Sequence, residues 1–224
     1  MAVSIELTSN SAALTNVTGA NVTHSVTAAT KIIGMFCTAS ANLTDRSPGA
    51  VTYAGAALAV AVSKDDANFE HCEIWFKDSP AAGTNTCTFS IVSGNVCAQL
   101  AVGCTGLLNA ATGAGNIATA TGSTDNPSLT CSSSAGEIII SILSSDVGPN
   151  STTTQGGSLL WEQEDIASDS DFNAQQQTAS GATTVCSWTS GAGLGDIWAA
   201  AAMSIGTSGA VAGDTSTPML NMVF

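Results

Sequence analysis

This chain is a series of short strand-like segments, separated by turn residues at intervals of roughly 8–12 residues. In Asn21–Ala28 one face holds Val22, His24, Val26 and Ala28, and the other face holds polar side chains. Alternation with a period of two is the pattern of a half-buried strand. Lys31–Ser40 is instead apolar almost throughout, which predicts a strand covered on both faces.

These segments predict an all-β fold, an antiparallel β-sandwich of the jelly-roll or Ig-like type. No segment of about a dozen residues shows a helical period built from good helix formers. We expect a single domain over residues 1–205, followed by a short C-terminal arm at 206–224. The other predicted strands are Val3–Leu7, Ala50–Tyr53, Ala57–Ser63, Glu70–Lys77, Thr86–Ser93, Val96–Cys104, Pro127–Ser132, Glu137–Leu143, Thr183–Thr189 and Ile197–Ile205.

Two segments rich in polar or small residues, Ala110–Asn126 and Asp165–Ser180, are predicted to be loops. The C-terminal arm is rich in Gly, Ser, Thr and Ala and ends in an apolar tip. An exposed apolar cluster needs cover, so one prediction is that the tip docks on a neighbouring subunit. The alternative is a frayed terminus. The candidate partner-binding residues are Met219, Leu220, Met222, Val223 and Phe224.

The charge balance excludes two classes of partner. The 224 residues hold 4 Lys and Arg against 17 Asp and Glu, a formal net charge of −13. Four cations cannot neutralise a run of phosphates, so nucleic-acid binding is excluded, and binding to an anionic membrane is not expected for the same reason. No cationic segment followed by an apolar stretch opens the sequence, so we expect synthesis in a cytoplasm.

The cysteine pattern points to buried thiols. The chain has 7 cysteines, an odd number, and no CxxC motif. Synthesis in a cytoplasm favours free thiols, and free cysteine behaves as a small hydrophobic residue. We therefore expect most of them in the core.

An acidic stretch holds the candidate metal ligands Asp165, Asp169 and Asp171. Asp169 and Asp171 are two residues apart, as in loops that bind hard cations. The Gly and Glu that complete an EF-hand loop are missing, so the expectation is a solvated loop without a metal, and no cofactor is expected.

The sequence offers no catalytic constellation. Glu70 and Glu73 lie on one predicted strand, where parity places them on opposite faces, so they do not form the carboxylate pair of a glycosidase. His71 and Cys72 are adjacent, so their side chains also point to opposite faces. His24 shares a face with apolar residues, as a core histidine does. We therefore predict no catalytic residues and a protein that is not an enzyme.

Several segments together resemble a β-sandwich module of tailed-phage virion surface proteins and related bacterial surface proteins. They are Val51-Thr-Tyr-Ala-Gly-Ala-Ala-Leu58, His71-Cys-Glu-Ile-Trp-Phe76, Thr124–Thr130 with Ser134–Ile140, Gly181–Trp188 and Trp198–Ile205. Their order and spacing match the module over about residues 20–206. The resemblance implies a sandwich on a virion exterior and no catalytic residues.

These observations lead us to expect a structural virion protein, a decoration or cement protein on the exterior of a bacteriophage capsid. Its expected partners are the major capsid protein and copies of itself, as a homo-oligomer such as a trimer. A tail fibre or spike module that binds host glycans is the alternative, and a hydrolase ranks third. In each of the first two cases the expected location is the virion, with hydroxyls taking the place of charges on a strand-built surface.

Overall fold

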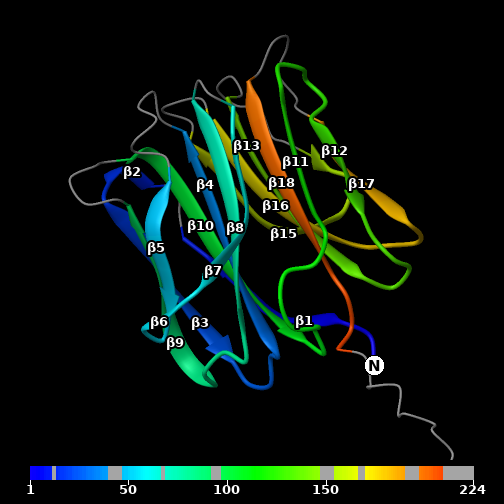
Figure 1. The fold of residues 1–224 in the computed structure, drawn as a ribbon. Helices are drawn as coiled ribbons and strands as arrows, with labels where there is room; N and C mark the ends of the chain where they lie inside the picture. The colour runs from blue at the N-terminus through cyan, green and yellow to red at the C-terminus, as the bar shows by residue number, and fades with distance from the viewer. Residues whose placement is uncertain are drawn as a thin grey trace, which may run out of the picture.

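The computed structural model describes residues 1–11, 14–39, 47–66, 69–91, 97–146, 154–165, 170–189 and 197–208. These residues form antiparallel β-strands arranged in four sheets, and the predicted all-β sandwich is confirmed (Figure 1). Within these ranges no helix is long and apolar enough to cross a membrane.

The first half of the chain builds two sheets. We call them the inner N sheet, in the order β1-β10-β4-β8-β7 with β2 also paired to β10, and the outer N sheet, in the order β3-β9-β5-β6. The strands are β1 (Ser4–Asn10), β2 (Leu14–Val17), β3 (Gly19–Val26), β4 (Lys31–Ala39), β5 (Pro48–Tyr53), β6 (Ala56–Ala57), β7 (Ala59–Asp65), β8 (Glu70–Asp78), β9 (Gly83–Ile91) and β10 (Cys97–Leu108).

The second half builds two more sheets. The inner C sheet has the order β11-β18-β13-β16-β15, and the outer C sheet has the order β12-β17-β14. The strands are β11 (Ile117–Gly122), β12 (Ser128–Ser132), β13 (Ile138–Asp146), β14 (Thr154–Gln155), β15 (Ser158–Asp165), β16 (Ser170–Thr178), β17 (Thr183–Thr189) and β18 (Trp198–Ile205).

The two halves repeat one topology. If the eight strands β1, β3, β4, β5, β7, β8, β9 and β10 are numbered one to eight, the inner N sheet reads 1-8-3-6-5 and the outer N sheet reads 2-7-4. Strands β11 to β18, numbered in the same way, give the same two orders. The orders 1-8-3-6 and 2-7-4 are those of a jelly roll, in which two Greek keys fold over each other. In both halves strand five departs from that order, because it extends the inner sheet beside strand six and does not pair with strand four. The described chain is thus a tandem pair of small jelly rolls.

The jelly rolls pack through their inner sheets in a pseudo-twofold arrangement. β4 lies against its equivalent β13, β7 lies against β11, and β1 lies against β15. The first strand of each half therefore meets the fifth strand of the other, as equivalent elements do across an isologous interface. One continuous core of side chains such as Met35, Ile140 and Ala201 fills the space between the inner sheets. This shared core accords with a single domain.

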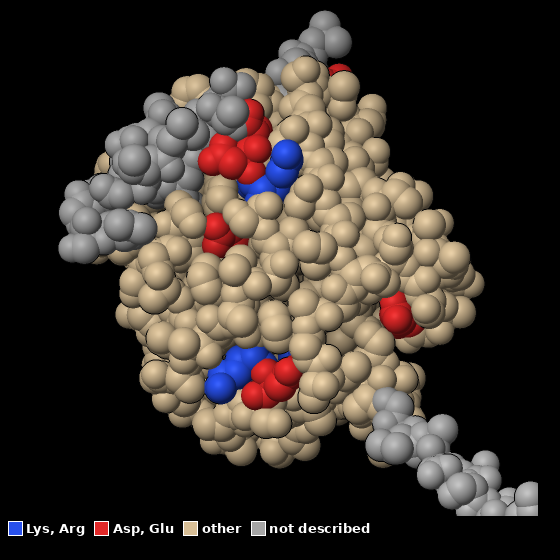
Figure 2. All heavy atoms as spheres, viewed as in Figure 1, with Lys and Arg blue, Asp and Glu red and all other residues tan. Residues whose placement is uncertain are grey.

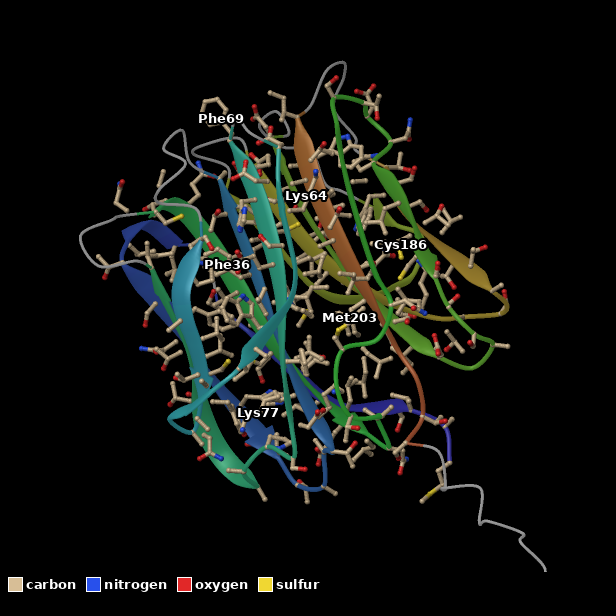
Figure 3. The ribbon with its side chains drawn as sticks, in the orientation of Figure 1. Phe36, Lys64, Phe69, Lys77, Cys186 and Met203 are labelled. Atoms are coloured by element: carbon tan, nitrogen blue, oxygen red, sulfur yellow. The ribbon has the colours of Figure 1, made fainter. Side chains whose placement is uncertain are left out.

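Both faces of the inner strands are covered, which explains their composition. Along β4, Met35 points into the core between the inner sheets, whereas Phe36 points into a second core beneath the outer N sheet (Figure 3). All nine residues of β4 are buried, so the predicted strand covered on both faces is confirmed. In β18 the Ala199–Ala202 run alternates between two cores, and its small side chains let three layers approach closely.

The strands of the outer sheets alternate as predicted. In β3, Val22, His24 and Val26 are buried, and Asn21 and Thr23 are exposed. The strand ends at Val26, so Ala28, predicted on the buried face, lies beyond it and is exposed.

Both segments predicted to be loops contain strands, and those two predictions are wrong. Ala110–Asn126 includes β11, an edge strand of the inner C sheet. Asp165–Ser180 includes β16, in which the six residues Ser170–Gln175 are all buried. Phe172 and Ala174 face the core between the inner sheets. The polar side chains of Asn173 and Gln175 lie on the opposite face, where they bind β17.

Candidate functional site

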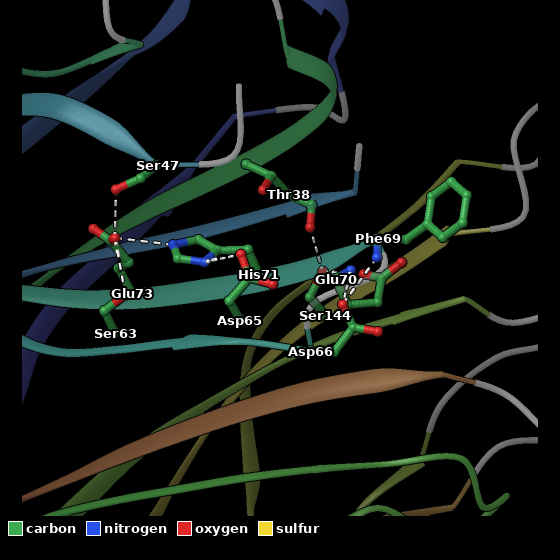
Figure 4. Close-up of polar contacts among 10 residues, drawn as sticks. All are labelled: Thr38, Ser47, Ser63, Asp65, Asp66, Phe69, Glu70, His71, Glu73 and Ser144. Carbon is green, nitrogen blue, oxygen red and sulfur yellow. Dashed lines mark hydrogen bonds and ion pairs between the residues drawn. The ribbon is translucent and has the colours of Figure 1, made fainter. Parts of the chain in front are cut away.

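A cluster of buried polar side chains lies on β8, beneath the outer N sheet. His71, Glu73 and Trp75 share one face of this strand because they are two residues apart. His71 is 4% exposed and Glu73 is 3% exposed. Across the strand pairing, Asp65 of β7 lies opposite His71, and Ser63 of β7 lies opposite Glu73. Figure 4 shows the cluster, which we call the Glu73 cluster.

The carboxylate of Glu73 is the centre of this cluster. Its Oε1 accepts hydrogen bonds from Ser47 Oγ at 2.7 Å, Ser63 Oγ at 3.1 Å and His71 Nε2 at 2.9 Å. Its Oε2 accepts one from Trp75 Nε1 at 2.7 Å. Burial by itself raises the pKa of Glu73, but the hydrogen bonds and the charge of His71 outweigh it, so the pKa lies below its ordinary value of 4.5. Glu73 is therefore ionised at neutral pH.

His71 connects this carboxylate to the neighbouring strands. Its Nδ1 lies 3.5 Å from Asp65 Oδ2, and its ring meets the Phe36 ring edge-on at a centroid distance of 6.3 Å. Because Nε2 donates to Glu73, the ring is held between a carboxylate on its own strand and one on the next.

This geometry does not match nucleophilic catalysis. A serine nucleophile needs its hydroxyl hydrogen-bonded to the imidazole that takes its proton. Here Ser47 and Ser63 both donate to the carboxylate of Glu73 instead. The arrangement instead supports a structural role. Ser47 immediately precedes β5 of the outer N sheet, and its hydrogen bond to Glu73 connects that sheet to the inner N sheet.

A second polar contact joins the two jelly rolls. Glu70 lies on the opposite face of β8 from Glu73, as parity predicted, and its Oε2 meets the hydroxyl of Ser144 on β13. The same hydroxyl is 2.9 Å from the carbonyl oxygen of Thr38 on β4. Both contacts are buried and cross the space between the inner sheets, so they fix one half against the other.

An ion pair with a buried lysine holds the segment between the two halves, residues 109–116, which we call the connector. Lys31 at the start of β4 is paired with Asp78 at the end of β8, and the two side chains are 1% and 29% exposed. Lys31 Nζ also donates to the carbonyl of Gly113 at 2.7 Å, and Gly113 N donates to Asp78 Oδ2 at 2.7 Å. Gly113 has a φ of 77°, which suits glycine and turns both of its backbone groups toward the pair. The lysine ammonium also lies 4.7 Å from the centre of the Phe76 ring.

The structure does not bring the three candidate metal ligands together in a described site. Asp171 lies on β16 and is fully buried, Asp169 lies outside the described residues, and Asp165 ends β15. Within the described ranges no group of three or more His, Cys, Asp or Glu side chains is placed to hold a metal ion.

The predicted partner-binding tip lies outside the described residues. Only the first three residues of the predicted arm are described, and they pair with the connector: Ala111 N donates to Gly206 O at 2.8 Å, and Ser208 N donates to Asn109 O at 2.7 Å. The tip residues Met219, Leu220, Met222, Val223 and Phe224 are not among those described.

All seven cysteines are buried free thiols, which confirms the expectation from the sequence. Burial raises the pKa of Cys37, Cys72 and Cys104 well above the ordinary value of 9.0. It raises the pKa of Cys131 to about 11. These groups are therefore uncharged and unreactive in the folded protein at neutral pH.

Comparison with known proteins yields no match: no family model, curated protein or solved structure is significantly similar to this chain.

Proposed function

We propose that this chain is a structural protein of a virion exterior, a decoration protein on a bacteriophage capsid that assembles with the shell and with copies of itself. The resemblance of its ordered strand segments to virion surface modules supports this proposal. The four-layer jelly-roll architecture is also suited to a rigid surface element.

The observation that carries the proposal is the contrast between the interior and the outer sheets. The charged groups of Glu73, Glu70 and Lys31 are used inside, where they join layers. The outer faces carry uncharged hydroxyls instead, as in the facing pair Thr23 and Thr86 of the outer N sheet. On the face drawn in Figure 2 the charged residues form small, separate spots.

The outer C sheet has the same character. Ser128, Thr130 and Ser132 of β12 are all exposed, and Val185 of β17, opposite Thr130, is 57% exposed. Such faces offer neutral, hydroxyl-rich surfaces for contact with other protein surfaces, and the net charge of −13 limits their non-specific association in solution.

The aromatic residues do not favour the glycan-binding alternative. Stacking on a sugar needs exposed aromatic rings, yet Tyr53 and three of the four tryptophans are buried, and among the described residues only Phe69 has an exposed ring, at 46%. The fourth, Trp75, is partly buried and donates its N–H to Glu73.

Quantitative mass spectrometry of purified particles tests the proposal. Particles are purified from a culture that produces this chain and are separated into heads and tails. The copy number of this chain in each fraction is compared with that of the major capsid protein. Many copies in the head fraction support the decoration role. A few copies confined to tails favour a fibre, and absence from particles contradicts both.

A further inference from the structure

We propose that Cys37 of β4 and Cys72 of β8 are a disulfide site, which is oxidised when the chain folds in an oxidising thiol–disulfide environment and stays reduced when it folds in a reducing one.

The strand register places the two residues directly opposite each other. In the β4–β8 ladder Cys37 pairs with Cys72, and the register has no irregularity along its nine pairs. One step beyond the ladder, Ser79 N donates to Thr30 O at 2.9 Å, which makes Thr30 and Ser79 a hydrogen-bonded pair. Hydrogen-bonded and non-hydrogen-bonded pairs alternate along antiparallel strands.

Seven steps separate Thr30 from Cys37, so Cys37 and Cys72 form a pair of the other, non-hydrogen-bonded kind. The Cα atoms of such a pair are about 4.5 Å apart, and its side chains are the closer of the two kinds. Disulfides bridge Cα separations of about 4.4–6.8 Å. The backbone therefore already has the spacing that the bridge needs.

Both thiols also point the same way. Cys37 and Cys72 are each 0% exposed and belong to the core between the inner sheets. Cys37 Sγ lies 3.5 Å from the carbonyl oxygen of Leu143 on the facing β13. Cys72 also contributes to the raised pKa of Cys37, after burial, which accords with their proximity.

A second pair of cysteines on neighbouring strands lacks this arrangement. Cys131 of β12 lies opposite Thr184, and Cys186 of β17 lies opposite Leu129, so the two cysteines are diagonal neighbours. Diagonal positions are about 7–8 Å apart, at or beyond the reach of a disulfide without backbone movement. This pair serves as an internal comparison.

The oxidation is a thiol–disulfide exchange with a small disulfide such as oxidised glutathione. One cysteine loses its proton to solvent, and its thiolate attacks a sulfur of the glutathione disulfide and expels one glutathione thiolate. The other cysteine, as thiolate, attacks the protein sulfur of the mixed disulfide and expels the second glutathione. Two protein thiols are oxidised, and one glutathione disulfide is reduced to two thiols.

Burial determines when this exchange occurs. Only a thiolate attacks, and in the folded chain both sulfurs are inaccessible and held as thiols. The exchange must therefore precede closure of the inner sheets, and afterwards the same burial shields the bridge from reductants. The redox state of the pair records the environment in which the chain folded.

Cell-free synthesis of the full chain tests the proposal. Synthesis runs in reduced glutathione or in a mixture of reduced and oxidised glutathione, and the soluble product is alkylated in denaturant and mapped by mass spectrometry. In the mixture we expect a linked peptide containing Cys37 and Cys72 and two fewer alkylated thiols at these positions. In reduced glutathione both are expected to be alkylated.

Two variants sharpen the test. Cys97→Ser is expected to leave the Cys37–Cys72 linkage unchanged, whereas Cys72→Ser is expected to abolish it and leave Cys37 alkylated. If Cys72→Ser is insoluble, Cys37→Ser replaces it. Alkylation of both residues in every condition, or a linkage of Cys37 to any other cysteine in the soluble wild-type product, overturns the proposal.

Discussion

The buried ion pair at the connector gives a prediction with an unusual asymmetry. Replacing Asp78 by Asn removes the anion beside Lys31 and turns the acceptor of the Gly113 N–H into an amide that competes as a donor. The lysine side chain is 1% exposed, so water cannot take the place of the lost carboxylate. Removing one partner of a buried pair costs about 3–5 kcal/mol.

Because Asp78 is 29% exposed, we place the loss of unfolding free energy in Asp78→Asn at the lower end, about 3 kcal/mol. Replacing the other partner of the pair, Lys31, is expected to lower the stability less. In Lys31→Met the remaining carboxylate is reached by solvent, so the loss is about 1 kcal/mol, the value of a typical net hydrogen bond. In the double variant the two changes are expected not to add, because the buried charge is gone.

Urea unfolding followed by tryptophan fluorescence measures these differences from the midpoint and slope of each curve. Lys64→Met is the matched control, since Lys64 is only partly buried on β7, and its stability is expected to stay within about 0.5 kcal/mol of wild type. A loss in Asp78→Asn equal to or smaller than that in Lys31→Met would show that the buried ammonium does not depend on Asp78.

Three further predictions concern the interior. A methyl group at Gly103 would overlap the indole of Trp161, so Gly103→Ala is expected to lower the free energy of unfolding by about 1–3 kcal/mol. Gly181 has open space around it, so Gly181→Ala should change the stability little, and urea unfolding compares the two variants. Because the pKa of Glu73 is lowered on folding, its stabilising effect holds above pH 4.5 and is lost as the pH falls through the lowered value. Glu73→Gln should therefore flatten the loss of urea resistance between pH 7 and pH 3, and an unchanged slope contradicts the assignment. Finally, in protein folded in a reducing environment, Ellman's reagent should label none of the seven thiols rapidly in the native state and all seven in denaturant.

The pattern of apolar residues predicts the strands whose buried faces are apolar. It works for β3, where Val22 and Val26 alternate with exposed polar residues, and for β4, where both faces are apolar because both are covered. In these elements the local pattern and the tertiary environment agree, so period and continuity are enough.

The pattern fails for β16 because its buried residues are polar. Asn173 accepts the Trp188 indole N–H at 3.0 Å, and Gln175 binds backbone groups of Gly157 and Ser187. Asn173 Oδ1 and the Gln175 amide thus bind groups from distant parts of the chain, and a local reading of the sequence cannot supply those partners.

The Glu73 cluster had a signal in the sequence that a search for carboxylate pairs overlooks. His71, Glu73 and Trp75 alternate on one strand and must share a face. Ser47, which donates to Glu73, precedes a strand of a different sheet, so the closed cluster could not be predicted from spacing alone.

The repeated topology of the two halves is also not visible in the sequence. A short correspondence remains in the equivalent strands β9 and β17, where Cys87-Thr-Phe89 matches Cys186-Ser-Trp188 and places a buried cysteine and a buried aromatic ring in each half. Many different sequences can supply apolar side chains of suitable volume in a suitable pattern, so two halves with the same topology need not share many residues.

We propose that this tandem jelly roll coats the exterior of a capsid. A cryo-electron microscopy map of intact particles tests it most directly. We expect density for a four-layered β-structure, at symmetry-related positions on the outer surface of the head, into which the described strands fit. A head surface that lacks such density, in particles shown by mass spectrometry to contain the chain, contradicts the claim.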